Sequence, residues 1–283
     1  MLAVVGSLNL DLVARVPHIP APGETVLGTA LSRHQGGKGG NQAVAAARLG
    51  VPVRFFGAAG DDAFGDELAL GLQREGIDGA GLLRVPGPSG CALIHVADDG
   101  ENAISVMPGA NLHAPAPPPH WPADLRMLLM QLEVPLPTVV AWAEVAAAAG
   151  VPVLLNAAPM QALPSALLQR LDTLVVNETE FAALGAEAAG LGPRRIVVTL
   201  GARGARAWHE GCWIEQPAHA VQVADSTGAG DTFVGALAAG LWQGRSFAEA
   251  MHRAGVAGAL ACTRLGAREG MPRAAELEAE LER

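Results

Sequence analysis

The chain has 283 residues, of which 50% are hydrophobic and 17% are charged, and this composition excludes a disordered chain. Lys and Arg number 19 against 28 Asp and Glu, so the net charge of −9 excludes the basic excess typical of proteins that bind nucleic acids or anionic membranes. Cys91, Cys212 and Cys262 are far apart and form no CxxC pair, which predicts neither a disulfide framework nor a zinc site.

The sequence predicts neither a signal peptide nor a membrane span. The N-terminal residues MLAVVGSLNLD reach Asp11 too early for the apolar region of a signal peptide. The longest stretch without Asp, Glu, Lys or Arg, residues 145–169, contains prolines and a glycine that would break a membrane span. We therefore expect a cytoplasmic protein that contacts neither membrane nor nucleic acid.

Apolar strand-like runs alternate with helical stretches, which predicts an α/β fold with a doubly wound, mostly parallel sheet flanked by helices. In chain order, the expected elements are a strand at 2–6, a helix at 42–49, a strand at 53–58, a helix at 66–74, a strand at 127–132, a helix at 138–149, strands at 151–156, 174–176 and 196–200, and a charged helix at 273–282.

Residues 10–35 and 90–107 interrupt this alternation, because neither segment contains a helical pattern. The second segment reads as two short strands around the turn Asp98-Asp99-Gly100. We predict that both segments form a small β-sheet lid over the site. The lid would be inserted in a single catalytic domain that spans residues 1–283.

Polar residues follow several of the predicted strands. In open α/β sheets, ligands bind beyond the carboxyl ends of the strands. Each of these residues could instead be a strand stop or a helix cap. The candidates are Asn9, Glu133, Asn156, Asn177 and Thr199.

Residues 225–231 read DSTGAGD and are followed by a helical pattern. Gly228 and Gly230 would let backbone N–H groups converge on an anion, and a helix N-terminus adds partial positive charge. Asp231 would lie in the first helical turn, where a carboxylate could accept a hydroxyl proton beside a bound phosphate. Helix capping alone is the alternative interpretation.

A second glycine-rich helix start lies at residues 36–41, GGKGGN, before the helix expected at Gln42. It contains Lys38, the only lysine of the chain. Gly39 follows this lysine where a Walker A motif needs Ser or Thr, and a GxGxxG fingerprint is also absent, which disfavours a nicotinamide dehydrogenase. Phosphate and sugar binding are therefore predicted from the two glycine-rich helix starts together.

Three further patterns suit a sugar and a nucleotide. Asn9 and Asp11 would share one side of an extended chain and suit vicinal hydroxyls, with an Asx turn as the alternative. Asn177 and Glu180 fit either a capping box or a water-mediated magnesium site. The loop at 199–204, TLGARG, could pass close to a nucleotide.

Together these motifs resemble the ribokinase branch of the PfkB-type carbohydrate kinases. The resemblance covers nearly the whole chain in order. It includes GSLNLD near the start, PGET at 22–25, GGKGGNQAVAAARLG at 36–50, LLMQLE at 128–133, VNETE at 176–180, TLGARG at 199–204 and DSTGAGDTFVGA at 225–236.

The resemblance implies ATP-dependent phosphorylation of D-ribose at its 5-hydroxyl, assisted by Mg²⁺ and K⁺, with Asp231 as the base. The implied anion hole is Gly228, Ala229 and Gly230. The implied sugar contacts are Asn9, Asp11, Gly37, Lys38, Asn41, Glu133 and Asp231. The implied nucleotide contacts are Asn177, Glu180, Thr199, Gly201, Ala202, Arg203, Gly204, Gly230 and Gly255. The implied potassium positions are Asp225, Thr227, Ala261, Arg264, Gly266 and Gly270.

The resemblance also implies a homodimer formed through the lid. Two positions depart from the family pattern, since Gly270 stands where Ser is frequent and Gly255 where Asn or His commonly approaches the adenine. Two alternatives stay open. The chain could be a PfkB-type kinase of another sugar, sugar phosphate or nucleoside, or a non-catalytic sugar- or nucleotide-binding protein.

Overall fold

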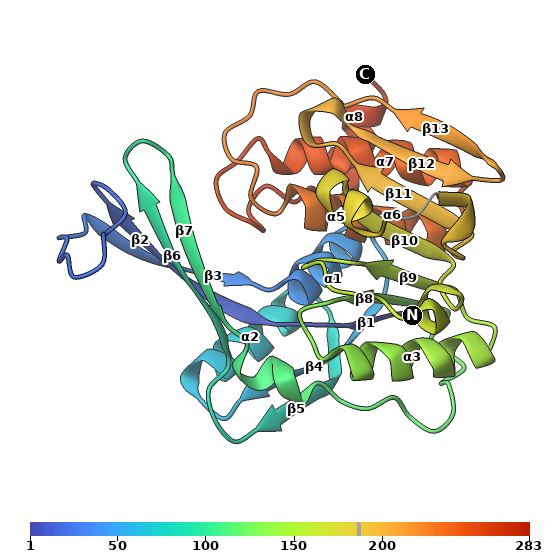
Figure 1. Ribbon diagram of the computed structural model, residues 1–283, viewed down its shortest axis with the longest axis horizontal. Helices are drawn as coiled ribbons and strands as arrows, with labels where there is room; N and C mark the ends of the chain where they lie inside the picture. The colour runs from blue at the N-terminus through green and yellow to red at the C-terminus, as the bar shows by residue number, and fades with distance from the viewer. Residues whose placement is uncertain (186–187) are drawn as a thin grey trace.

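The computed structural model describes residues 1–185 and 188–283. Its main layer is a nine-stranded sheet (Figure 1). In spatial order the strands are β13 (Cys212–Gln216), β12 (Ala205–His209), β11 (Arg195–Thr199), β10 (Thr173–Asn177), β9 (Val153–Asn156), β8 (Met127–Gln131), β1 (Leu2–Val5), β4 (Val53–Gly60) and β5 (Asp78–Val85). All neighbours from β11 to β5 are parallel, and β12 and β13 add an antiparallel edge. The predicted doubly wound, mostly parallel fold is confirmed.

Helices cover both faces of this sheet. Leu2 and Val4 of β1 belong to one apolar core, whereas Ala3 and Val5 belong to the other, because successive side chains of a strand point to opposite faces. The first core includes residues of α1 (Lys38–Arg48), α2 (Ala63–Arg74), α6 (Ala229–Trp242), α7 (Phe247–Ala261) and α8 (Ala274–Leu281). The second includes residues of α3 (Leu136–Ala148) and α4 (Ser165–Leu168), with α5 (Glu178–Ala183) packed against it.

The glycine-rich segment before Gln42 is helical, which corrects the predicted helix start. Helix α1 begins at Lys38, four residues earlier than expected. A Cβ on Gly39 would lie 2.5 Å from the Ser7 nitrogen, so only glycine lets this first turn pack against the chain after β1. The glycines therefore serve close packing and not a loose entrance loop.

A second, four-stranded sheet projects from the main sheet (Figure 1). It consists of β3 (Ala30–Gly36), β2 (Asn9–Val16), β6 (Gly90–Ala97) and β7 (Asn102–Met107), in that spatial order. These strands come from the two segments that lack a helical pattern, and we refer to this small sheet as the lid. Short 3-10 turns lie at Gly109–His113, Ala188–Gly190 and Gly201–Arg203.

The strand order places a switch point beside β1, which pairs with β4 on one side and β8 on the other. Ligands of doubly wound sheets bind at such a point, beyond the carboxyl ends of the strands. Ser7 follows β1 and Glu133 follows β8, and the Ser7 hydroxyl donates to Glu133 Oε2 at 2.5 Å across this crevice. No helix among the described residues combines the length and apolar character needed to cross a membrane.

Candidate active site

Asp231 lies in the first turn of α6, and two side chains of α1 hold its carboxylate. Asn41 Nδ2 donates to Asp231 Oδ2 at 3.0 Å. Gln42 Nε2 donates to Asp231 Oδ1 at 3.0 Å. Because each oxygen has its own donor, the carboxylate is fixed in one orientation.

Gln42 connects this carboxylate to the centre of the main sheet. Its Nε2 also donates to Asn156 Oδ1 at 2.9 Å, and its Oε1 accepts from Gln131 Nε2 at 2.7 Å. Gln42 and Gln131 are fully buried. Buried amides of this kind are costly unless paired, so the network ties Asp231 firmly to β8 and β9.

The start of α6 provides free backbone donors. Among the described residues, the amides of Gly230 and Asp231 have no acceptor, whereas the Ala229 amide donates to the Ser226 carbonyl at 3.2 Å. Gly228 precedes the helix with a φ of 77°, and a Cβ there would lie 2.3 Å from the Ala267 carbonyl oxygen. Glycine is therefore required at 228, and among the described residues the amides of Gly228, Gly230 and Asp231 are available to an anion.

The start of α1, which is the second glycine-rich segment, differs from this arrangement. The Lys38 amide donates to Glu133 Oε2 at 2.9 Å, and the Gly40 amide donates to the Ser7 carbonyl at 2.9 Å. The Gly39 amide donates to the Ser7 hydroxyl oxygen at 3.3 Å. Since these amides are already paired, α1 contributes side chains to the site and not an anion hole.

The residues predicted to contact a sugar come together where β2 and β3 meet α1. Asn9 is buried, and its Oδ1 accepts from Asn111 Nδ2 at 2.8 Å. A Cβ on Gly37 would lie 2.8 Å from the Asn9 nitrogen. A Cβ on Gly36 would lie 2.2 Å from Asp11 Oδ2, so the Asp11 carboxylate lies directly over that glycine.

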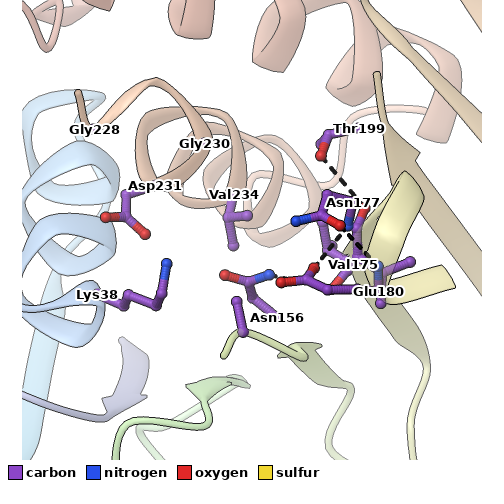
Figure 2. A pocket seen from close by; sticks show the side chains of 12 residues that line it. Lys38, Asn156, Val175, Asn177, Glu180, Thr199, Gly228, Gly230, Asp231 and Val234 are labelled. Atoms are coloured by element: carbon purple, nitrogen blue, oxygen red, sulfur yellow. Dashed lines mark hydrogen bonds between the residues drawn. The ribbon is translucent and has the colours of Figure 1, made fainter. Parts of the chain in front are cut away.

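A cavity of about 190 Å³ extends from this region to the ends of β10 and β11 (Figure 2). Lys38 and Asp231 lie at one side of it, and Asn177, Glu180 and Thr199 at the other. It is lined by Lys38, Asn156, Ala158, Val175, Val176, Asn177, Glu180, Thr199, Gly228, Gly230, Asp231 and Val234.

Asn177 and Glu180 form the capping box of α5 as well as lining the cavity. Asn177 Oδ1 accepts from the Glu180 amide at 2.8 Å, and Glu180 Oε2 accepts from the Asn177 amide at 2.7 Å. The capping interpretation of this pair is thus correct, and it does not exclude a role in binding.

Other predicted nucleotide residues do not line this cavity. Gly201, Ala202 and Arg203 form an exposed 3-10 turn after β11, closed by Gly204. Gly255 lies on α7, where a Cβ would lie 3.4 Å from the Gln216 side chain. These positions flank the edge hairpin β12–β13 instead.

The charges of the site are unevenly distributed. The pKa of Lys38 is raised, chiefly by the nearby Asp231 carboxylate, and Glu133 and Glu180 act in the same direction against desolvation. Burial raises the pKa of Asp11 to about 6, although Arg268 opposes the shift. Lys38 is therefore a charged ammonium beside the predicted base, and Asp11 is a carboxylate that protonates easily.

The positions predicted to bind potassium lie in the loop before α6, at the last residue of α7 and in the loop after α7, and hydrogen bonds join the two loops. Asp225 Oδ1 accepts from the Thr227 amide at 2.9 Å and from its hydroxyl at 2.7 Å, and Asp225 Oδ2 accepts from the Gly266 amide at 2.9 Å. Burial alone would raise the pKa of Asp225, but these hydrogen bonds outweigh it and lower the pKa.

Two of the predicted potassium positions have restricted side chains. A Cβ on Gly270 would lie 2.0 Å from the Ala261 carbonyl oxygen, so this backbone has no room for a serine there. The Arg264 side chain points to α8, where its Nη2 donates to Glu276 Oε1 at 2.9 Å. Any contribution of 264 and 270 to an ion must therefore come from the backbone.

Comparison with known protein families matches residues 1–274 to the pfkB family carbohydrate kinases. The chain belongs to this family. It is 38% identical to the ribokinase of Haemophilus influenzae, over 96% of this chain and 95% of that protein. The crystal structure of ribokinase from Thermotoga maritima superimposes with a TM-score of 0.89 at 34% identity, covering 100% of this chain and 99% of that one.

A second solved structure is that of Arabidopsis thaliana ribokinase complexed with ribose and ATP. It matches with a TM-score of 0.91 at 32% identity, covering 100% of this chain and 98% of that one. The resemblance to PfkB-type kinases drawn from the motifs is therefore confirmed.

Sequence reasoning missed three polar residues that organise the site of this pfkB-family chain. Gln42 and Asn111 are buried and hold Asp231 and Asn9, respectively. Arg268 is also buried and contacts Asn41. The one available signal was the position of Gln42 directly after the GGKGGN segment.

Proposed function

We propose that this chain transfers the γ-phosphoryl group of ATP to the 5-hydroxyl of D-ribose. The similarity to ribokinases over almost the whole chain supports this activity, as does the likeness to a relative complexed with ribose and ATP. The observation that carries the proposal is the start of α6, where the oriented Asp231 carboxylate lies beside backbone amides that have no acceptor in the described part of the chain.

In this mechanism Asp231 accepts the proton of the attacking sugar hydroxyl. The amides of Gly230 and Asp231 donate to the transferring phosphoryl group, over whose oxygens the negative charge is spread in the transition state. Lys38 lines the same cavity and contributes a positive charge. Positioning and charge stabilisation account for most of the catalysis, since phosphoryl transfer needs little covalent chemistry from the protein.

The sugar would lie between the lid and the start of α1. Asn9 and Asp11 on β2 offer an amide and a carboxylate to its hydroxyls, and Asn41 and Glu133 approach from the main domain. Gly37 would let the sugar approach the backbone closely, because this residue has a φ of 84° and no Cβ.

The nucleotide would extend from Asp231 toward the carboxyl ends of β10 and β11. Thr199 lines the cavity, and the turn from Gly201 to Gly204 continues from it along the expected path of the nucleoside. Asn177 and Glu180 lie where they could hold, through water, the Mg²⁺ that accompanies the phosphates.

The oxygen atoms around Asp225 fit a potassium ion. Asp225 and Thr227 supply carboxylate and hydroxyl oxygens, and Ala261 supplies a carbonyl oxygen packed against Gly270. Hard oxygen donors of this kind suit an alkali cation. When bound, the ion would add positive charge close to the start of α6. We expect potassium to raise turnover despite the missing side chain at Gly270.

We also propose that two copies pair through their lids. The strand register places Ile104 and Val106 of β7 on the same face as Asp11, and these two side chains are 55% and 53% exposed. An exposed apolar sheet face favours association. Light scattering should give a dimer for the wild type and a monomer for Ile104→Glu with Val106→Glu, whereas Leu112→Glu, outside the lid, should leave the dimer intact.

The decisive experiment measures ADP release with MgATP across ribose, 2-deoxyribose, fructose, fructose 1-phosphate and adenosine, with potassium or with a large cation. We expect ribose to be the preferred acceptor. Asp231→Asn should lower kcat by about 10²-fold or more, the usual contribution of a general base. The control is Asp66→Asn, which removes an acid from the first turn of α2 and should keep full activity.

Two outcomes would contradict the proposal. Preference for another acceptor would overturn the ribose assignment while keeping the role of Asp231. Wild-type kcat in Asp231→Asn would overturn the assignment of the base.

A further inference from the structure

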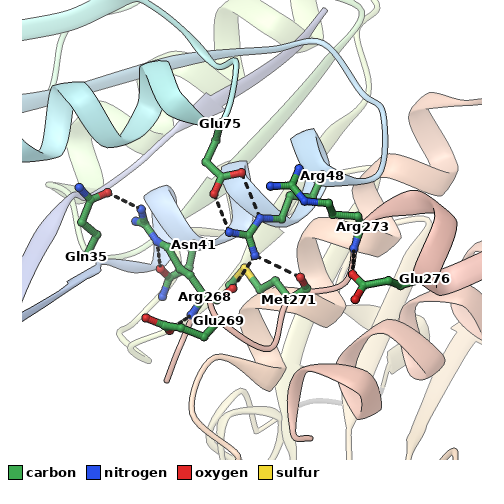
Figure 3. Close-up of polar contacts among 9 residues, drawn as sticks. All are labelled: Gln35, Asn41, Arg48, Glu75, Arg268, Glu269, Met271, Arg273 and Glu276. Carbon is green, nitrogen blue, oxygen red and sulfur yellow. Dashed lines mark hydrogen bonds and ion pairs between the residues drawn. The ribbon is translucent and has the colours of Figure 1, made fainter. Parts of the chain in front are cut away.

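Arg268 is a buried cation in the segment between α7 and α8 (Figure 3). Only 9% of the residue is exposed. Its Nε donates to Asn41 Oδ1 at 2.8 Å, its Nη1 to Gln35 Oε1 at 2.9 Å and its Nη2 to the Gly36 carbonyl at 3.1 Å. All three acceptors are neutral carbonyl oxygens, and among the described residues no carboxylate forms an ion pair with Arg268.

The surroundings of Arg268 leave space for this guanidinium. A Cβ on Gly40 would lie 2.5 Å from Arg268 Nη2. A Cβ on Gly71 would lie 1.8 Å from Gln35 Oε1, and Gln35 is anchored by its Nε2, which donates to the Glu67 carbonyl at 2.8 Å. Two helix glycines of the main domain and an anchored glutamine of the lid strand β3 thus define the guanidinium site.

The backbone beside Arg268 is held as firmly as its side chain. Arg48 of α1 donates to the Arg268 carbonyl, and the same nitrogen donates to the Met271 carbonyl at 3.1 Å. Glu75 in turn binds the Arg48 guanidinium through both of its carboxylate oxygens. The guanidinium of Arg268 therefore enters the α1 region from a fixed backbone.

The stability of the fold alone gives a weak account of this residue. A buried charge that forms no ion pair costs more than an apolar side chain of similar volume, and for Arg268 the carboxylates of Asp11, Glu75 and Asp231, which lie beyond ion-pair distance, offset only part of this cost. The contact that leads to the active site is the one with Asn41, whose other amide atom, Nδ2, donates to Asp231 Oδ2. The Arg268 guanidinium therefore binds the oxygen of the Asn41 amide, and the Asp231 carboxylate binds its nitrogen.

This arrangement permits one orientation of the Asn41 amide. If the amide were rotated by half a turn, its NH₂ group would face the N–H donors of Arg268 and its oxygen would face the Asp231 carboxylate. Both contacts would be repulsive. With a neutral apolar side chain at 268, one of these two penalties disappears and the amide is less firmly oriented.

We propose that Arg268 is a positioning residue for the phosphoryl acceptor, because its guanidinium holds the Asn41 amide in the orientation that binds Asp231 and faces the sugar. This inference rests on the proposed kinase function. Asn41 lies at the Asp231 side of the cavity, away from Asn177 and Thr199. The effect of Arg268 is therefore confined to the sugar and to proton transfer, and ATP binding is spared.

The test compares Arg268→Met, Arg268→Lys and the control Arg253→Met by steady-state kinetics and by calorimetric titration with ribose in the absence of ATP. Arg253 is a matched control, because it is a largely buried arginine of α7 that pairs with Glu278 on α8 and, among the described residues, makes no hydrogen bond with Asn41. For Arg268→Met we expect kcat/KM for ribose to fall about tenfold or more, the effect of losing a charged hydrogen-bond donor. The KM for ATP should change less than about twofold.

Two further measurements separate positioning from mere support of the fold. Arg268→Lys keeps the positive charge but has a single donor nitrogen in place of three, so it should recover part of the lost kcat/KM. In an Asn41→Leu background, Arg268→Met should add less than about twofold, because its effect passes through Asn41.

Several outcomes would overturn the inference. These are an unchanged kcat/KM and unchanged ribose affinity in Arg268→Met, equal changes in the KM for ribose and for ATP, or full additivity with Asn41→Leu. If the wild type bound ribose without phosphorylating it, the proposed function would fail, and the ribose affinities of the same variants would still decide the role of Arg268.

Discussion

Protonation of Asp11 should weaken ribose binding in the range just below neutral pH. Asp11 lies on β2 of the lid, and burial raises its pKa to about 6. Arg268 and His34 oppose this shift, whereas Glu133 and Asp231 add to it. Because burial disfavours the charged form, the carboxylate is lost as the pH falls through about 6 and not near the usual value of 3.8.

The expected size follows from that pKa. The ionised fraction of Asp11 is about 90% at about pH 7 and about 10% at about pH 5. If only the carboxylate accepts hydrogen bonds from the sugar hydroxyls, the apparent affinity for ribose falls about tenfold over this interval. The KM for ATP should not follow this curve, since Asp11 does not line the cavity that reaches Asn177 and Thr199.

The assay is the KM for ribose at saturating MgATP, measured at several values between about pH 5 and about pH 8. Asp11→Asn is the control, because its amide cannot titrate and its KM should be high and independent of pH. A flat KM for ribose in the wild type, or the same pH dependence in Asp11→Asn, would refute the reasoning.

Three substitutions test the supports of the site. Gly37→Ala combines a φ of 84° with a Cβ 2.8 Å from the Asn9 nitrogen, and urea unfolding should show a loss of about 1–3 kcal/mol in the free energy of unfolding. Asn111→Ala removes the acceptor of the Leu8 amide and the donor to Asn9, so it should cost about 1–3 kcal/mol and raise the KM for ribose more than that for ATP. Trp142→Ala empties a fully buried position on the inner face of α3 and should cost about 3–5 kcal/mol while leaving both KM values near wild type. Wild-type stability in any of the three would contradict the corresponding contact.

Most of the main sheet was predictable because its central strands are buried on both faces. Such strands appear as uninterrupted apolar runs, as in LAVV of β1 and MLLM of β8. The antiparallel strands β12 and β13 escaped prediction, since ARAWH and CWIEQ mix charged, polar and aromatic residues. A short segment of such mixed composition has neither an apolar run nor a clear alternation that distinguishes a strand from a loop.

The candidate site was predictable where a single local segment carries the chemistry, as at residues 225–231. Contacts between distant segments were not predictable. Arg268 meets Asn41 across 227 positions of the chain, and Asn111 meets Asn9 across 102. A buried polar residue is chosen by its three-dimensional partners, and a single sequence does not name them. The pairing of the amides at the start of α1 was not predictable for the same reason, because their acceptors belong to Ser7 and Glu133, which follow the distant strands β1 and β8.

The single lysine at the start of α1 makes this protein suitable for site-selective chemical labelling. Lys38 is the only lysine, so an amine-selective acylating reagent has two targets in the whole chain, Lys38 and the N-terminus. Only the first lines the cavity beside Asp231. The raised pKa of Lys38 lowers the fraction of reactive amine, and a bound nucleotide would shield what is left. The mass of the peptide that contains Lys38 would therefore report whether a nucleotide is bound, without any engineered probe.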